Sequence, residues 1–219
     1  LFLLVACLAP HAALARDDFS RTQNGGWGDA DEGGPWTLVG GSAAFSVADG
    51  VGTITLAPSH NREARLNQIS ATDTLTTADF VIDEPANGGA MSVTVVGRRV
   101  GGSVYAGRIR LEPGGVVRLY ALRDETALGS SYVLPGVTYS GGEVIHAKVE
   151  VSGTGSTQVR LKVWVGDGAE PGAWLISSTD SSAAMQAAGS VGIISAVSAA
   201  SANAATHVRV DKYRVESVA

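Results

Sequence analysis

The stretch Val144–Val165 reads VIHAKVEVSGTGSTQVRLKVWV, and its alternation indicates the fold class. In Val144–Val151 and again in Val159–Val165 the odd-numbered residues are apolar, whereas most even-numbered residues are polar. A period of two is that of a β-strand with one buried face. The Gly-containing run Ser152–Gly155 between the two segments has the composition of a turn. The stretch therefore predicts two antiparallel strands that each bury one face.

Alternating or β-branched runs of this kind recur along the chain. Gly-rich turns such as Asn87-Gly88-Gly89 and Pro113-Gly114-Gly115 separate them. Besides the two runs above, the expected strands are Ala44–Val47, Val51–Leu56, Ala64–Ile69, Leu75–Ile82, Met91–Val96, Val104–Leu111, Val116–Leu122, Val191–Ser195 and His207–Val215.

One short helix is expected at Ser182–Ala188, with Asp180 or Ser181 as its N-cap and Gly189 closing it. The sequence shows neither an internal repeat nor an interdomain linker. We therefore expect one all-β domain with at most one short helix.

The composition supports this fold class. Among 219 residues there are 28 Gly, charged residues make up 17%, and only three of the 16 basic residues are Lys. This excludes a helical bundle or a coiled coil, because those folds need many Lys and Glu. A net charge of −5 gives no basic excess for nucleic acid, so no nucleic-acid partner is expected.

The N-terminus resembles a secretory leader. Leu1–Ala15 is an uncharged apolar run that ends in Ala13-Leu14-Ala15, an A-x-A cleavage site, and Arg16 follows it. We expect a signal peptide at 1–15, a domain at 16–219 and a secreted protein. The alternative is a lipoprotein anchored at Cys7, but the residues after Cys7 stay apolar.

Cys7 is the only cysteine, so the mature chain would hold no disulfide, no thiol nucleophile and no Cys-ligated zinc. No later stretch approaches 18 consecutive apolar residues, so no membrane span is expected.

The polar positions of four strands suggest a binding face. If Val104–Leu111, Val116–Leu122, Val144–Val151 and Val159–Val165 were neighbours in one sheet, their outer face would carry six Arg or Lys against one acid, Glu150. The candidate ligand-binding residues on it are Arg108, Arg110, Arg118, Tyr120, His146, Lys148, Arg160, Lys162 and Trp164.

Two interpretations of this face stay open. It would bind a polyanion or a glycan, since Arg forks suit carboxylates and sulfates and aromatic rings stack on sugars. It would otherwise be an ordinary solvated sheet surface. Trp27 and Trp36 would line a rim, although Trp36 also suits the core, and Trp174 would pack a corner.

The order of elements resembles a known fold family. Asp17–Arg21, Gly26-Trp27-Gly28 and Gly34–Thr37 are similar to the opening of concanavalin A-like (laminin-G-like) jelly rolls, in particular of secreted actinobacterial accessory modules. Phe45–Thr53, Gly189–Ile193 and Val208–Tyr213 continue the pattern. The resemblance implies a jelly-roll sandwich of two antiparallel sheets, one of them concave and facing a ligand.

Many members of that family hold a structural calcium on the convex side. The resemblance implies such an ion here, with Asp18 and Asp211 as the matching ligands, since calcium takes hard oxygen donors. The other interpretation of these carboxylates is that they are ordinary turn acids.

Catalytic motifs are scarce. The E-x-D-x-x-E run of jelly-roll glucanases is absent, which argues against a glycosidase. A polysaccharide lyase acting on a uronate polymer is the remaining enzyme hypothesis, because Tyr120, His146, Arg118 and Arg160 supply its residue types. The sequence motifs of jelly-roll alginate lyases are absent, apart from a weak partial match in Glu143–His146.

We therefore expect a secreted, monomeric, non-catalytic module that recognises a polysaccharide or cell-surface glycan, with an acidic glycan as ligand. The alternatives are the uronate lyase and a purely structural or adhesion domain.

Overall fold

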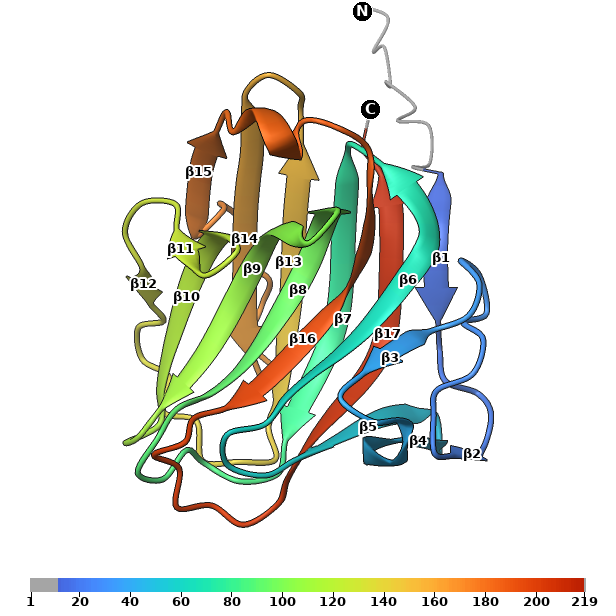
Figure 1. Ribbon diagram of the computed structural model, residues 1–219. Helices are drawn as coiled ribbons and strands as arrows, with labels where there is room; N and C mark the ends of the chain where they lie inside the picture. The colour runs from blue at the N-terminus through green and yellow to red at the C-terminus, as the bar shows by residue number, and fades with distance from the viewer. Residues whose placement is uncertain (1–11, 219) are drawn as a thin grey trace, which may run out of the picture.

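The computed structural model describes residues 12–218, which form a sandwich of two antiparallel sheets (Figure 1). Among these residues one sheet has nine strands and the other eight. In spatial order the nine-stranded sheet consists of β15 (Ile176–Asp180), β14 (Thr157–Val165), β13 (Val144–Ser152), β7 (Thr74–Ile82), β17 (Thr206–Ser217), β5 (Val51–Leu56), β4 (Phe45–Ala48) and β2 (Gln23–Asn24), with β1 (Ala13–Asp17) also paired to β17.

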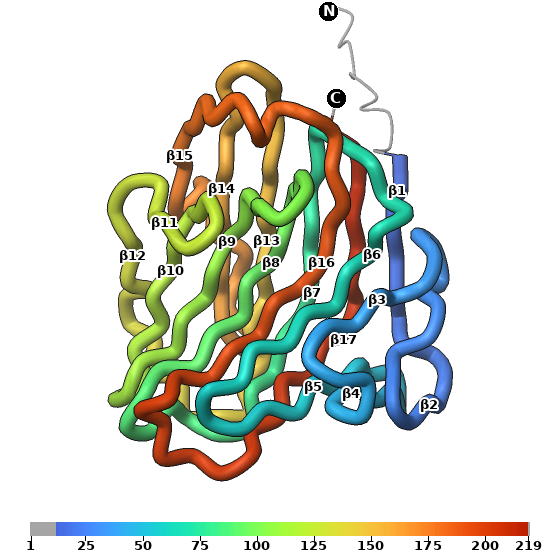
Figure 2. Tube along the Cα trace, viewed as in Figure 1, coloured from blue at the N-terminus to red at the C-terminus, as the bar shows by residue number. Residues whose placement is uncertain are grey.

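The eight-stranded sheet lies in front of the other in the view of Figure 2. In spatial order it consists of β11 (Thr126–Ala127), β10 (Val116–Arg123), β9 (Ser103–Glu112), β8 (Met91–Val100), β16 (Gly189–Val197), β6 (Asn61–Ala71) and β3 (Thr37–Val39), with β12 (Tyr132–Val133) paired to β10.

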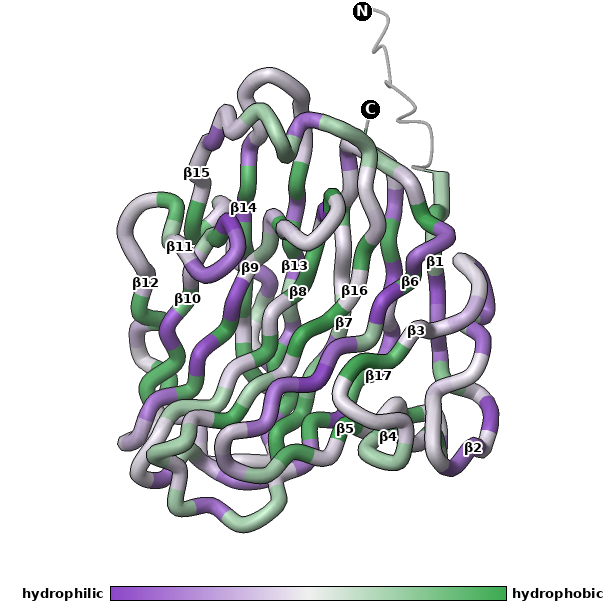
Figure 3. The backbone as a smooth tube through the Cα atoms, in the orientation of Figure 1, coloured by the Kyte–Doolittle hydropathy of each residue, from purple (hydrophilic) through white to green (hydrophobic). Residues whose placement is uncertain are grey.

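The all-β prediction is confirmed. Each strand expected from alternation is present, and most extend one to three residues beyond the expected ends. The pattern missed β1, β15 and four strands of two or three residues, because such short segments give no measurable period. Figure 3 shows hydrophilic and hydrophobic positions following one another along β6 and β9.

The expected helix at 182–188 is reduced to a single 3-10 turn. This turn is η2 (Ala183–Met185), and a second 3-10 turn, η1 (Ser42–Ala44), precedes β4. Ser182 precedes η2 without a side-chain cap, and Gly189 begins strand β16 instead of closing a helix. Among residues 12–218 the structure holds no helix with the length and apolar character to span a bilayer.

Strand β1 crosses the expected signal cleavage position, since Ala13–Asp17 pairs with β17. Residues 1–11, including the alternative anchor Cys7, lie outside the described residues. Cleavage after Ala15 stays a prediction.

The core lies between the inner faces of the two sheets and extends under the N-terminal segment. Trp27 and Trp36 are both buried there, with ring centroids 5.1 Å apart in an edge-to-face arrangement. The prediction that Trp27 lines a binding rim is wrong, whereas the alternative interpretation of Trp36 as a core residue is confirmed. Their large apolar rings gain more from burial against Phe19, Phe45 and Tyr213 than from a solvated loop position.

A fully buried carboxylate organises this aromatic cluster. Asp17 accepts hydrogen bonds from the Trp36 indole (2.7 Å), from the Phe19 amide (2.9 Å) and from both terminal nitrogens of Arg21 (2.8 and 2.7 Å). A buried charge is tolerated only when it is paired and hydrogen-bonded in this way.

The buried Arg98 ties the two sheets together at one end of the sandwich. A bulge in β8 turns its side chain inward. One terminal nitrogen donates to Thr157 Oγ1 (3.0 Å) and to the Met185 carbonyl (3.1 Å). The other donates to the carbonyls of Gly153 (2.9 Å) and Thr72.

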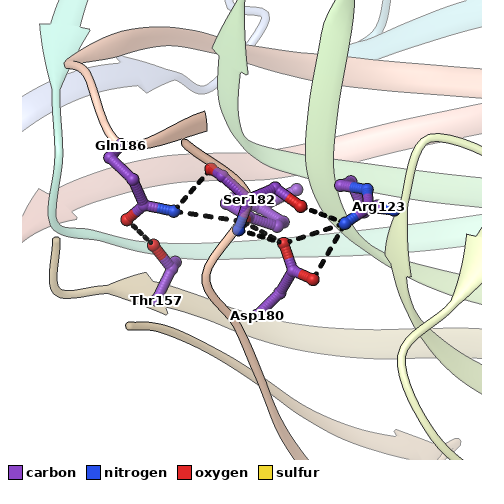
Figure 4. A network of polar contacts seen from close by, with 6 residues as sticks. Arg123, Thr157, Asp180, Ser182 and Gln186 are labelled. Carbon is purple, nitrogen blue, oxygen red and sulfur yellow. Dashed lines mark hydrogen bonds and ion pairs between the residues drawn. The ribbon is translucent and has the colours of Figure 1, made fainter. Parts of the chain in front are cut away.

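Asp180 is the centre of the adjoining network (Figure 4). Its carboxylate accepts hydrogen bonds from Tyr105 (2.5 Å), Arg123 (2.9 Å) and the Ser182 amide (3.0 Å), and Gln186 links Tyr105 to Thr157. Partial burial alone would raise the pKa of Asp180, but these hydrogen bonds outweigh it and lower the pKa to about 2. The network joins β9 and β10 to β14 and β15 across the sandwich.

Replacing Asp17 should destabilise the fold. Asp17→Ala leaves the half-buried Arg21 without its partner and the Trp36 indole without an acceptor, so we expect a loss of about 3–5 kcal/mol in the free energy of unfolding. Urea denaturation measures it. Asp29→Ala, an exposed acid in the same segment, is the control and should change little; an equal loss in both variants would contradict the role of Asp17.

Asp180→Asn should be destabilised at pH 7 by about 1–3 kcal/mol, since its hydrogen bonds lose the charged acceptor. Because folding lowers the pKa of Asp180 from 3.8 to about 2, its stabilisation is present above pH 4 and is lost as the pH falls through about 2. Urea denaturation of both proteins from pH 7 to pH 2 should therefore show the difference shrinking below pH 4. A constant difference would contradict the ionic role.

Candidate functional site

The nine predicted ligand-binding residues all point away from the core, so the predicted alternation is confirmed. The assumption that they share one face is wrong. Strands β9 and β10 belong to the eight-stranded sheet, whereas β13 and β14 belong to the nine-stranded sheet. Arg108, Arg110, Arg118 and Tyr120 therefore lie on one outer surface of the sandwich. His146, Lys148, Arg160, Lys162 and Trp164 lie on the opposite one.

The predicted excess of positive charge is also wrong, because acids from other strands and loops pair with these bases. On the eight-stranded sheet Glu112 contacts Arg110 (3.3 Å) and Arg118 (3.0 Å), and Glu125 contacts Arg108 (2.7 Å). On the opposite side of the sandwich the partners are Glu150 of β13, Asp79 of β7 and Glu170 of the loop between β14 and β15. Alternation places Glu112 and Glu150 on the same faces as their partners, but it does not reveal that Glu125, Glu170 and Asp79 are partners as well.

A groove lies on the outer face of the eight-stranded sheet, across β6, β16, β8 and β9. It consists of two adjoining hollows of about 360 and 170 Å³. Asn61, Thr94, Arg108, Glu125 and Ile194 line both of them. The floor rests on a small buried apolar cluster of Val96, Val104 and Ala106, against which Ile194 packs. The groove thus combines an apolar base with polar walls.

Arg108 is fixed at the wall of this groove. Its two terminal nitrogens donate to the two carboxylate oxygens of Glu125, both at 2.7 Å, and its Nε donates to Thr94 Oγ1 at 3.0 Å. Glu125 sits at the tip of the β10–β11 hairpin and is 81% exposed. The fork from Arg108 lowers the pKa of the Glu125 carboxyl.

Arg110 lines the larger hollow and is less constrained. Its side chain is 45% exposed, and its ion pair with Glu112 is long at 3.3 Å. Tyr120, on the neighbouring strand β10, lies in register with Arg108 on the same outer face. One surface therefore offers an anionic or hydroxyl-rich ligand the guanidinium of Arg110 and the phenol of Tyr120. It also carries the guanidinium of Arg108, which the exposed Glu125 engages.

The four residues of the lyase hypothesis do not form one active site. Tyr120 and Arg118 lie on one sheet, and His146 and Arg160 lie on the other. His146 is also not free to act as a base, since its Nδ1 lies 2.5 Å from Asp79 Oδ1 and its Nε2 lies 3.2 Å from the Gly166 carbonyl oxygen. Both ring nitrogens already face acceptors.

The proposed calcium ligands have other partners. Asp18 pairs with Arg16, and the amide of Lys212 donates to Asp211 (2.7 Å). Within the described part of the chain, no group of three His, Cys, Asp or Glu residues is arranged to hold a metal ion. Calcium binding at Asp18 and Asp211 therefore stays a prediction.

Several groove residues escaped the sequence analysis. Asn61, Ser92, Thr94 and Ser198 reach the groove only because β6, β16 and β8 are neighbours. Their strands lie far apart in the sequence, so no local pattern could have grouped them. The pairing of Glu125 with Arg108 depends on the fold of the β10–β11 turn, which strand alternation does not predict.

Comparison with known proteins supports the fold. Neither the protein-family models nor the curated proteins contain a match to the sequence. Solved structures do match. The alginate lyase Aly36B has a TM-score of 0.63 at 11% identity over 95% of this chain and 98% of that chain. The PL-14 alginate lyase from Aplysia kurodai has a TM-score of 0.55 at 11% identity over 83% and 90%.

A CBM2 module of the evolved Dit protein of Lactobacillus casei BL23 phage J-1 is also similar, with a TM-score of 0.57 at 12% identity over 95% of this chain and 97% of that chain. At such identities the likeness speaks for the architecture, not for a shared reaction. The chain thus has the concanavalin A-like jelly-roll sandwich that its motifs suggested.

Proposed function

We propose that the protein is a non-catalytic carbohydrate-binding module whose ligand lies in the groove of the eight-stranded sheet. The observation that carries this proposal is the groove itself, an open hollow on a sheet face with an apolar floor and walls of Asn, Ser, Thr and Arg side chains. Such a lining suits a sugar, which presents apolar C–H faces and a rim of hydroxyl groups.

The similarity to solved structures supports a polysaccharide as the partner. Proteins of this architecture include the two alginate lyases, and a variant of Aly36B is in complex with an alginate tetrasaccharide. The likeness to Aly36B covers 95% of this chain, so the two share the architecture of stacked sheets on which the groove lies.

An acidic glycan is the ligand that the groove favours. Arg110 offers a half-exposed guanidinium, and the Arg108 fork already holds the carboxylate of Glu125 in the geometry that a uronate or a sulfate would take. A ligand carboxylate can thus add to Arg110 or replace Glu125 on Arg108.

The carboxylates of the groove argue for binding without hydrolysis. Glu63 pairs with Arg65 and Arg99, Asp124 accepts from the Val104 amide, and Glu125 is held by Arg108. A glycosidase needs one carboxyl group that stays protonated as an acid. The pKa of Glu125 is lowered, whereas an acid catalyst needs a raised pKa to keep its proton.

Arg110→Ala should weaken binding to polyuronates about tenfold, since it removes a charge-assisted contact from the larger hollow. Titration calorimetry of the protein with oligomers of alginate and of polygalacturonate, at two salt concentrations, measures this. Arg209→Ala, on the outer face of the opposite sheet, is the control. Equal affinities in the wild type and in Arg110→Ala would reject the groove, and no binding to any glycan would leave a structural or adhesion role.

A uronate lyase is the second candidate, favoured by the register that sets Tyr120 beside Arg108 on the groove side of β9 and β10. In such a reaction the arginine would neutralise the sugar carboxylate while the phenol moved the proton. Unlike the original hypothesis, this arrangement uses residues of one sheet only.

Incubation with polyuronates tests the lyase directly. β-elimination creates a carbon–carbon double bond, which is followed by its ultraviolet absorption. If the protein is a lyase, Tyr120→Phe should lower the rate by about 10²-fold or more while substrate still binds. The non-catalytic proposal expects no such absorption from either protein.

We also propose an extracellular location, which rests on the A-x-A site at Ala13–Ala15. Sequencing the N-terminus of exported protein tests it, with Arg16 as the expected first residue.

A further inference from the structure

Two lysines face each other on the outer surface of the nine-stranded sheet. Lys148 on β13 and Lys162 on β14 are direct partners in the antiparallel register. Like charges placed directly opposite on neighbouring strands repel each other. The pair is 25% and 12% exposed, so solvent screens the repulsion only in part. An anion placed between the two ammonium groups would offset this repulsion.

The protein provides that anion from its own chain. Glu170, in the loop 166–175 between β14 and β15, places its Oε1 3.0 Å from Lys148 Nζ and 3.1 Å from Lys162 Nζ. Hydrogen bonds from Lys148 and Lys162 lower the pKa of the Glu170 carboxyl against the opposing effect of partial burial. Glu170 is therefore a carboxylate bound at a two-lysine site.

The loop that carries Glu170 is anchored at its two ends. The Gly166 amide donates to the Val144 carbonyl (2.8 Å), and the Leu175 amide donates to the Leu161 carbonyl (3.0 Å). Between these anchors Lys162 contacts the Gly172 carbonyl at 3.4 Å, and Glu170 remains 38% exposed. The carboxylate can thus leave the lysines without unpairing β14 from β15.

Aromatic rings flank the two lysines. The Trp174 ring lies 4.9 Å from the Arg160 guanidinium and 5.2 Å from Lys162 Nζ. Trp164, two residues beyond Lys162 on the same face of β14, stacks on His146 with ring centroids 5.0 Å apart. Both indoles are half-buried, so part of each remains accessible beside the cations.

We propose that Lys148, Lys162 and Trp174 form a second glycan site, in which the carboxylate or sulfate of an acidic sugar replaces Glu170. Glu170 occupies the position of the ligand's anionic group in the free protein. The indoles favour a sugar over an acidic peptide, because pyranose C–H faces pack on aromatic rings while the charged group meets the lysines. This site lies on the face opposite to the groove and does not rest on the groove's function.

Binding of dextran sulfate tests the proposal, with unmodified dextran and poly-glutamate as comparison polymers. The protein should carry Arg110→Ala throughout, so that the groove contributes little and the two proposals fail separately. Glu170→Gln should bind dextran sulfate about fivefold more tightly, because the competing carboxylate is gone. The double variant Lys148→Ala, Lys162→Ala should bind about tenfold less tightly.

Asp167→Asn is the matched control, since it removes the same charge from the same loop. If it strengthened binding as much as Glu170→Gln, the effect would be one of net charge and the site would be rejected. Unchanged affinity in the double lysine variant would reject it as well. Poly-glutamate that bound as tightly as dextran sulfate would overturn the assignment to a sugar.

The emission of Trp174 gives a second readout that does not depend on the lysine variants folding well. Dextran sulfate should shift the tryptophan fluorescence of Glu170→Gln, and Trp174→Phe in that background should abolish the shift. A shift that persisted in Trp174→Phe would exclude Trp174 from the site.

Discussion

The two sheets can bury their apolar faces only against each other, and this constraint decides where the polar side chains of the long strands must lie. Along β9, β10, β13 and β14 every second residue faces the core, so the residues between them face solvent on one side of the sandwich or the other. At Gly107 the packing is so close that a Cβ would lie 2.7 Å from Val149. Close packing leaves no room for a one-residue slip, which would carry the arginines inward.

The same constraint explains what could be predicted from the sequence. Alternation identified the strands and the outward direction of Arg108 or Lys148, because both depend on residues two apart in the chain. It could not assign β13 and β14 to a different sheet from β9 and β10, because sheet membership depends on β7 and β8, far away in the sequence. The Trp36 indole donates to the buried Asp17, a contact that no local pattern indicates, and Trp27 packs against Trp36.

The charge pairs show the same limit in another form. Arg108 and the two lysines meet acids that lie outside the expected strands, namely Glu125 and Glu170. Arg118 and Arg160 instead meet Glu112 and Glu150 of their own hairpins. The molecule therefore presents ion pairs in place of bare positive patches. An anionic ligand at either face would exchange with an internal carboxylate, and the selectivity of each face would then depend on how strongly that carboxylate is held.

The strand β17 is covered on one side by two different partners. β5 pairs with Thr206–Val210, β1 pairs with Tyr213–Glu216, and the bulge at Asp211–Arg214 lies between the two pairings. The N-terminal strand thus occupies amides and carbonyls that would otherwise form an open edge. Since unpaired edges recruit strands from other molecules, this pairing opposes sheet-to-sheet aggregation, and a chain cleaved after Ala15 would keep only the pairs of Arg16 with Arg214 and of Asp17 with Tyr213.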